Sequence, residues 1–177
     1  MKIVITGGAA CGKSAHAERI LCRHTPGGSR LYMATMQPFG DAGQARIARH
    51  RKLRAGKGFE TAEQYTSLAH FTAVKHYDGI LLECITNLLA NELFSPEVAG
   101  QNAVSAILEG INRLEKQCST LVIVTGEIFS DGETYPPETM QYIKMLGNIN
   151  CALFGAADAA AESVCGILIP YKGEPLL

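Results

Sequence analysis

Residues 2–14 read KIVITGGAACGKS, and the fold that we predict for the chain rests on this stretch. The apolar run Lys2–Thr6 predicts a strand covered on both faces. Residues 7–14 fit the P-loop pattern G-x-x-x-x-G-K-[ST], in which backbone N–H groups and the start of the next helix face phosphate oxygens. We expect Lys13 to reach the β- and γ-phosphates as a catalytic residue, and the Ser14 hydroxyl to bind Mg²⁺. The predicted nucleotide-binding residues of this loop are Gly7, Gly8, Ala9, Ala10, Cys11, Gly12, Lys13 and Ser14.

The rest of the chain repeats the alternation of strand and helix. Four more apolar runs predict strands, at residues 30–35, 79–83, 120–125 and 163–169. Helical spacing predicts helices at residues 14–24, 41–54, 61–76, 85–94, 101–117 and 137–157. Thr61 and Gln64 have the spacing of a capping box, which places the start of the third helix at Thr61. The order predicts an α/β fold, a mostly parallel sheet flanked by helices, in a single P-loop nucleotide-binding domain spanning residues 1–177.

Composition excludes several classes of protein. A hydrophobic content of 47% and a charged content of 19% exclude a disordered chain. No apolar run approaches the length of a membrane span, and the first residues do not resemble a signal peptide. The six cysteines are scattered without a C-x-x-C pair, which argues against a zinc site or a disulfide framework and favours a reducing cytoplasm.

Charge is concentrated in one segment. The formal net charge is −1, yet residues 46–57 carry six basic side chains and no acidic one. The other ten basic residues are spread among all 17 acidic residues, so a general polyanion-binding surface is not expected. Aromatic residues for base stacking are absent from the segment, which argues against single-stranded RNA as its ligand. The sequence therefore predicts one short anion-binding segment and no nucleic-acid partner.

The basic segment carries a histidine in a distinctive position. Arg46, His50 and Arg54 are spaced by four and share one helix face, with Arg51 beside them. Guanidinium groups bind phosphate in a bidentate manner, and a neutral imidazole among them can attack phosphorus as a nucleophile. The alternative is a solvated charged helix with one surface histidine.

Glu83 ends the apolar run at residues 80–82, at the carboxyl edge of the predicted sheet, where ligands of open α/β sheets bind. A P-loop enzyme needs a carboxylate near its metal, so Glu83 is a candidate metal ligand. A contact with a ribose hydroxyl, or the capping of the helix that starts near Ile85, is the alternative role.

Several stretches, in this order, resemble one family. They are ITGGAACGKSAHAE, LYMATMQ, ARIARHRKLR, FETAE, ILLECITNLLAN, LVIVTGE and LGNINCALFGAAD. The chain resembles the bifunctional adenosylcobinamide kinase / adenosylcobinamide-phosphate guanylyltransferase of cobalamin biosynthesis. The resemblance implies phosphorylation of adenosylcobinamide, followed by transfer of GMP from GTP through a GMP–histidine intermediate. The family motif places that histidine on His50.

The resemblance also implies a sheet of the RecA type, a homotrimer, GTP and ATP as substrates, and Mg²⁺. Beyond the P-loop, it implies nucleotide contacts at Ala34, Thr35, Met36, Arg51, Lys52, Leu53, Arg54, Glu63 and Glu83. Glu63 is a candidate through the family alone, and as an isolated residue it fits an acid in the first turn of a helix equally well. Arg46 joins this set through its place on the face of His50.

The sequence departs from the family pattern at four places. Ala10-Cys11 replaces Arg-Ser, Phe59 replaces Trp, residues 126–129 replace Asn-Glu-Val-Gly, and residues 142–144 replace Phe-Arg-Asp. Two other functions therefore remain as alternatives. One is a P-loop kinase for another small alcohol or nucleotide, and the other is a non-catalytic nucleotide-binding regulatory module.

Overall fold

The computed structural model describes residues 1–95, 100–174 and 176, without the side chains of Ala42, Arg46 and Gln101. Its strands are β1 (Lys2–Thr6), β2 (Arg30–Ala34), β3 (Phe59–Glu63), β4 (Tyr77–Glu83), β5 (Cys118–Val124), β6 (Ala159–Val164) and β7 (Ile167–Lys172). Its helices are α1 (Lys13–His24), α2 (Gly40–Arg54), α3 (Ile85–Phe94), α4 (Ala103–Glu115) and α5 (Pro137–Ala156), with short 3₁₀ turns η1 (Leu68–His70) and η2 (Gly100–Asn102). Within the described residues, no helix is both long and apolar enough to cross a membrane.

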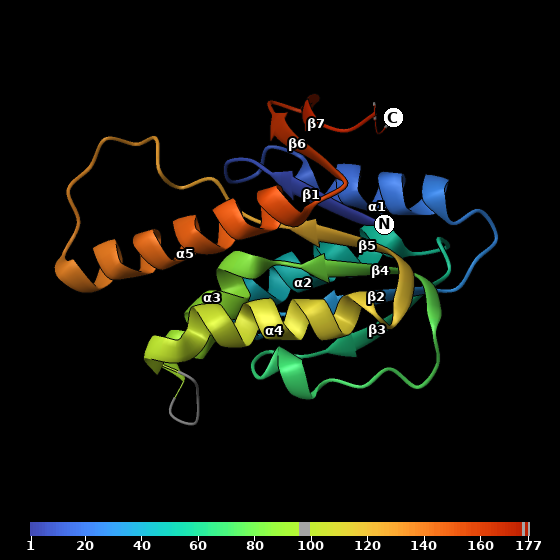
Figure 1. Cartoon of the computed structure of the whole chain (residues 1–177), viewed down its shortest axis with the longest axis horizontal. Coiled ribbons are helices and arrows are strands. Elements are labelled where there is room, and N and C mark those ends of the chain that lie inside the picture. Colours follow the sequence, from blue (N-terminus) through green and yellow to red (C-terminus); the bar gives the residue numbers. More distant parts are fainter. Residues whose placement is uncertain (96–99, 175, 177) are drawn as a thin grey trace.

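The strands form one seven-stranded sheet in the order β3-β2-β4-β5-β1-β6-β7. All neighbours pair in parallel except β7, which runs antiparallel to β6 at one edge (Figure 1). The predicted mostly parallel α/β sheet is therefore confirmed. Because parallel strands end at the same edge, the P-loop after β1, the ends of β2 and β4, and the loop after β5 lie together.

Alternate residues of the strands bury two separate apolar layers. Val4 packs with Leu82 and Ile123 beneath α3, α4 and α5. Ile3 and Ile5 face the other side, where they pack with α1. Since successive side chains of a strand point to opposite faces, this explains why the central strands are apolar at nearly every position. The two layers therefore cover the sheet on both faces.

The predicted helix at residues 61–76 is wrong. Residues 59–63 instead form β3, which pairs in parallel with β2 and places Thr61 opposite Tyr32. Gln64 does not complete a capping box, because its backbone N–H donates to Ala34 O and its side chain to Thr66 O. The chain then runs through a loop and the single turn η1 to β4. Pairing with β2 therefore outweighs the local helix signal.

The single strand predicted at residues 163–169 is also wrong. Val164 pairs with Ile167, so Cys165 and Gly166 form a two-residue turn between β6 and β7. Both turn residues have positive φ, 48° and 83°, as a type I′ hairpin requires. The other predicted strands and helices are present, with ends that differ by a few residues.

Candidate functional site

The P-loop joins β1 to α1 in a compact turn. Gly7 and Gly12 have φ values of 143° and 97°, which are strained for residues with a side chain. At Gly7 a Cβ would also lie 2.3 Å from the carbonyl oxygen of Ser163. Lys13 Nζ donates to Gly7 O at 2.7 Å and to Gly8 O. The ammonium group is thus held over the loop by carbonyl oxygens, which phosphate oxygens can replace.

The β6–β7 hairpin supports the loop from behind. Cys11 O accepts hydrogen bonds from Ser163 Oγ at 2.7 Å and from Gly166 N at 3.0 Å. His16 Nε2 lies 3.0 Å from Gly166 O and ties α1 to the same turn. Sequence reasoning did not find these supports, because they join residues about 150 positions apart.

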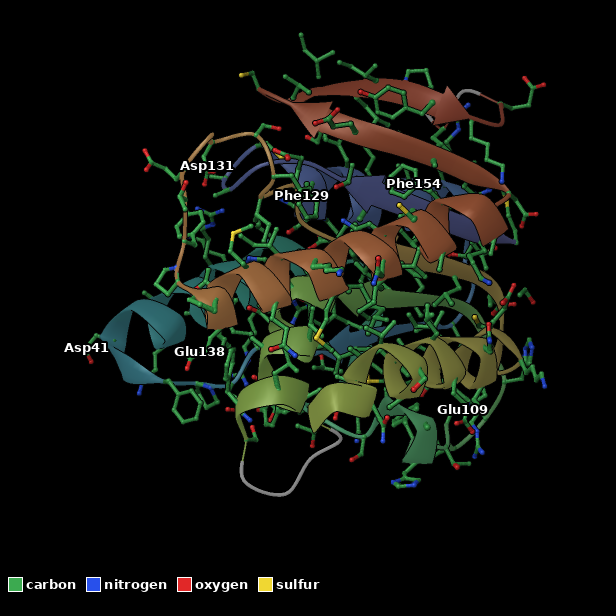
Figure 2. All side chains as sticks on the ribbon, turned by 60° about the vertical axis from the view of Figure 1, so that its left-hand side comes forward. Asp41, Glu109, Phe129, Asp131, Glu138 and Phe154 are labelled. Carbon is green, nitrogen blue, oxygen red and sulfur yellow. The ribbon has the colours of Figure 1, made fainter. Side chains whose placement is uncertain are left out.

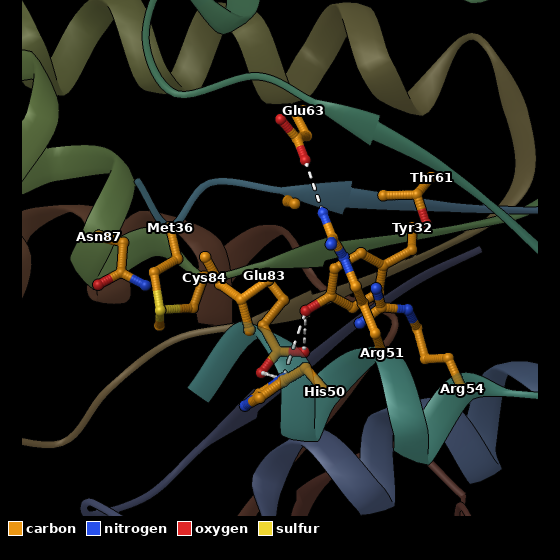
Figure 3. A pocket seen from close by; sticks show the side chains of 12 residues that line it. Tyr32, Met36, His50, Arg51, Arg54, Thr61, Glu63, Glu83, Cys84 and Asn87 are labelled. Carbon is orange, nitrogen blue, oxygen red and sulfur yellow. Dashed lines mark hydrogen bonds and ion pairs between the residues drawn. The ribbon is translucent and has the colours of Figure 1, made fainter. Parts of the chain in front are cut away.

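Glu83 is the centre of a buried polar network (Figure 3). Its Oε1 accepts a hydrogen bond from Ser14 Oγ and lies 3.3 Å from His50 Nδ1, and its Oε2 accepts one from the Tyr32 hydroxyl at 3.0 Å. Burial opposes ionisation of Glu83, but the contacts with His50, Ser14 and Tyr32 outweigh it and hold its pKa below the ordinary value. Burial, together with the charge of Glu83, raises the pKa of Tyr32, so the phenol stays a proton donor.

His50 lies on the buried face of α2, and 7% of its surface is exposed. Its Nδ1 faces both Glu83 and the Tyr32 hydroxyl, at 3.3 and 3.4 Å. A carboxylate at Nδ1 stabilises the tautomer that carries its proton there, which leaves the lone pair on Nε2. His50 therefore has the environment of a nucleophile oriented by a carboxylate.

Arginines of α2 take two different positions around this network. The guanidinium carbon of Arg54 lies 3.4 Å from the centroid of the Tyr32 ring, and its Nη1 is buried without a partner among the described residues. Arg51 is exposed and pairs with Glu63 at 3.3 Å (Figure 3). The Arg54 guanidinium is thus buried and keeps an N–H donor without a partner among the described residues, whereas the Arg51 guanidinium is exposed at the surface.

Two cavities meet at His50. The larger one, here called the P-loop cavity, measures about 290 Å³. It is lined by the P-loop, α2, the start of α3 and the loop after β5. The smaller one, here called the side cavity, measures about 40 Å³ and lies between the ends of β2 and β3 and α2. His50, Glu83 and Cys84 line both cavities, so the histidine stands between a phosphate-binding loop and a second pocket.

Most of the predicted site residues line one cavity or the other. Those in the P-loop cavity are Gly7, Ala9, Ala10, Cys11, Gly12, Lys13, Ser14, His50, Leu53 and Glu83. Those in the side cavity are Ala34, Met36, His50, Arg51, Arg54, Glu63 and Glu83.

Three of the predicted residues line neither cavity, namely Gly8, Thr35 and Lys52. Thr35 is fully buried and its hydroxyl bridges to the backbone of Cys84, accepting from N at 2.7 Å and donating to O at 2.9 Å. Lys52 is exposed, and Gly8 accepts the bond from Lys13 through its carbonyl. The side chain of Arg46 lies outside the described part of the structure.

Sequence reasoning missed other residues of the cavities, notably Tyr32, Thr86, Glu127 and Tyr142, whereas Arg49 belongs to the predicted anion-binding segment. Tyr32 lies in the apolar run of β2 and reads as an ordinary core residue. Its exceptional feature, a hydroxyl aimed at Glu83, depends on a strand 51 residues away. Two signals pointed to Glu127, namely its position two residues after the threonine that ends the predicted strand and its place in the stretch LVIVTGE.

The described residues hold no cluster of three or more histidine, cysteine or acidic side chains that suits a metal ion. A P-loop site needs fewer protein ligands, because phosphates and water supply the others. Ser14 Oγ and Glu83 Oε1 are hard oxygen atoms in contact beside the loop, so they fit Mg²⁺ bound together with a nucleotide.

The sheet topology and the P-loop define a P-loop NTPase with a RecA-like fold. Solved structures with this architecture include the flagellar accessory protein FlaH from Methanocaldococcus jannaschii, with a TM-score of 0.54 and 14% identity over 98% of this chain and 78% of that one. A prototypical ATPase from the type III secretion system of pathogenic bacteria gives a TM-score of 0.56 and 13% identity, over 96% of this chain and 56% of that one. At such identities these similarities show the fold alone.

Sequence comparison identifies the family. The model of the cobinamide kinase / cobinamide phosphate guanyltransferase family matches residues 3–171. The bifunctional adenosylcobalamin biosynthesis protein CobU of Salmonella typhimurium is 34% identical, over 97% of this chain and all of that one. CobU of Escherichia coli is 30% identical over the same shares. The chain therefore belongs to the cobinamide kinase / cobinamide phosphate guanyltransferase family.

Proposed function

We propose that this protein phosphorylates adenosylcobinamide and then transfers GMP from GTP to adenosylcobinamide phosphate, giving adenosylcobinamide-GDP and pyrophosphate. The observation that carries the proposal is the position of His50, oriented by Glu83 at the junction of the P-loop cavity and the side cavity. A kinase alone needs no nucleophilic histidine. The alternative function, a P-loop kinase without guanylyl transfer, therefore does not explain why His50 is oriented in this way.

In the guanylyl step, His50 Nε2 attacks the α-phosphorus of GTP. The bond from that phosphorus to the bridging oxygen breaks, and pyrophosphate leaves with the electron pair. Lys13 and Arg51 offset the charge of the leaving group, and Arg54, which lines the side cavity and has a buried N–H without a partner among the described residues, supplies a further donor. The terminal phosphate of adenosylcobinamide phosphate then attacks the same phosphorus, and the imidazole leaves. Glu83 stabilises the imidazole while it carries positive charge.

In the kinase step, the γ-phosphate of ATP or GTP passes to the hydroxyl of the aminopropanol arm. The P-loop N–H groups and Lys13 hold the β- and γ-phosphates in place. Ser14 and Glu83 would hold Mg²⁺, which would supply positive charge to the triphosphate. Positioning and electrostatic stabilisation account for most of the catalysis in such a transfer.

The test is covalent labelling with GTP that carries the label at the α-phosphate. The wild type should retain acid-labile, alkali-stable label, as expected of a phosphoramidate, and His50→Ala should retain none. His76→Ala removes an exposed histidine outside both cavities and should label like the wild type. An unlabelled wild type, or equal label on His50→Ala, contradicts the histidine intermediate.

We also propose that the protein acts in the cytoplasm as a homotrimer, as the family resemblance implies. The six cysteines are all described and form no disulfide with one another, which suits a reducing compartment. Light scattering on the purified protein should give three times the 19.0 kDa mass of one chain. A mass of one or two chains contradicts the trimer.

A further inference from the structure

The loop after β5 carries a carboxylate to the P-loop cavity. This loop runs from the sheet, past Phe129 and Asp131, to the start of α5 (Figure 2). Glu127 N donates to Gly7 O at 3.0 Å, so the residue is tied directly to the first glycine of the P-loop. Glu127 is one of the residues that line the cavity of Lys13 and Ser14.

The two oxygens of the Glu127 carboxylate have different surroundings. Oε1 accepts hydrogen bonds from Phe129 N and from Ser130 Oγ, both at 2.8 Å. No group of the described residues donates to Oε2. One oxygen therefore fixes the orientation of the carboxylate, and the other is available to a molecule in the cavity.

His50, which also lines this cavity, is assigned above as the nucleophile, and three other polar side chains have no free acceptor for a proton. Glu83 uses both oxygens, Oε1 toward Ser14 and His50 and Oε2 toward Tyr32. The Tyr142 hydroxyl donates to Thr86 O at 3.0 Å, and burial raises its pKa to about 12. Arg49 is a cation and accepts no proton. Among the described residues that line the cavity, Glu127 is thus the carboxylate with a free oxygen.

We propose that Glu127 is the general base of the phosphoryl-transfer step, an inference that rests on the proposed function. The acceptor hydroxyl lies in the P-loop cavity and gives its proton to Glu127 Oε2. Its oxygen forms a bond to the γ-phosphorus while the bond from that phosphorus to the β,γ-bridging oxygen breaks. The bridging oxygen keeps the electron pair and leaves as part of the nucleoside diphosphate.

This assignment gives the two reactions different residues of the P-loop cavity. Glu127 comes from the loop after β5, and the His50–Glu83 pair comes from α2 and β4. The phosphate that attacks GMP in the second step is already ionised at neutral pH, so guanylyl transfer needs no base at Glu127. Loss of the Glu127 carboxylate should therefore slow the kinase reaction and leave guanylyl transfer unchanged.

The test compares Glu127→Gln with the wild type in two assays with adenosylcobinamide, ATP, GTP and Mg²⁺. The amide oxygen of Gln can still accept from Phe129 N and Ser130 Oγ, so the loop is preserved. We expect the kinase kcat to fall by about 10²- to 10⁴-fold with an unchanged KM for ATP, as for loss of a general base. The acidic limb of the pH–rate profile should disappear. Labelling of His50 by GTP, and GMP transfer to added adenosylcobinamide phosphate, should stay within about twofold.

Glu133→Gln is the matched control, because this exposed glutamate lies in the same loop outside the cavity and should keep the wild-type kinase rate. A Glu127→Gln kinase rate within threefold of the wild type overturns the proposal. An equal fall of phosphorylation and of His50 labelling overturns it too, because the residue then supports the loop instead of accepting a proton. If GTP labels His50 of the wild type but the wild type does not phosphorylate adenosylcobinamide, the kinase half of the proposed function is contradicted, and the role of Glu127 with it.

Discussion

Tyr32→Phe removes one hydroxyl from the centre of the site and keeps the ring on which Arg54 stacks. The lost hydrogen bond goes to a buried carboxylate, and bonds to charged groups contribute about 1.5–3 kcal/mol. We therefore expect the free energy of unfolding at pH 7 to fall by about 2 kcal/mol. Urea denaturation measures this loss. The urea concentration at the midpoint should fall, and the slope of the unfolding free energy against urea concentration should not change.

Tyr142→Phe is the matched control, because its hydroxyl donates to a neutral acceptor, the backbone oxygen of Thr86. Such a bond contributes about 0.5–1.5 kcal/mol, so this variant should lose less stability than Tyr32→Phe. Equal losses in the two variants, or a larger loss in Tyr142→Phe, would refute the reading of Glu83 as an ionised, hydrogen-bonded acceptor.

The stability lost in Tyr32→Phe should also depend on pH. The folded-state pKa of Glu83 lies below its ordinary value of 4.5, so its interactions stabilise the protein above that pH and are lost as the pH falls through the folded-state pKa. Tyr32→Phe removes one cause of the lowered pKa. The difference in stability between wild type and Tyr32→Phe should thus be full at pH 7 and shrink below about pH 4.5. A difference that increases as the pH falls below 4.5 would contradict the assignment.

Two further variants test the loop and the histidine. Gly7→Ala places a Cβ 2.3 Å from Ser163 O, so we expect a loss of about 1–3 kcal/mol in stability and weaker ATP binding by calorimetry. In Gly8→Ala the Cβ meets nothing within 4 Å, so this variant should keep the stability of the wild type; equal losses of stability in both variants would contradict the account of the loop. Glu83→Gln removes the charge beside His50 Nδ1, and rapid-quench labelling should show GMP transfer to His50 slowed on the order of 10³-fold. A rate within tenfold of the wild type would show that the carboxylate does not orient the nucleophile.

Local sequence patterns predicted those parts of the fold whose interacting residues are close together in the chain. The P-loop is specified by glycines within eight residues, and its strand and helix are adjacent to it in the chain. The site residues on the carboxyl edge follow from the parallel order, which places Glu83 near Ser14 although β5 lies between their strands.

The features that sequence reasoning missed depend on distant partners. β3 is half exposed, and it forms because β2 offers an edge to pair with, which no local pattern in residues 59–63 reveals. The turn at Cys165 lacks the Asn-Gly or Asp-Gly pair that marks most type I′ turns. Tyr32 and Glu127 join the site through contacts with β4 and with the P-loop that exist only in the folded chain.

The central claim is that His50 carries GMP during the reaction. The most direct measurement is mass spectrometry of peptides from protein incubated with GTP and Mg²⁺, under alkaline conditions that preserve a phosphoramidate. The account predicts a GMP adduct on the peptide that contains His50, which disappears when adenosylcobinamide phosphate is added and is absent from His50→Ala. An adduct on another residue, or guanylyl transfer that persists in His50→Ala, would contradict it.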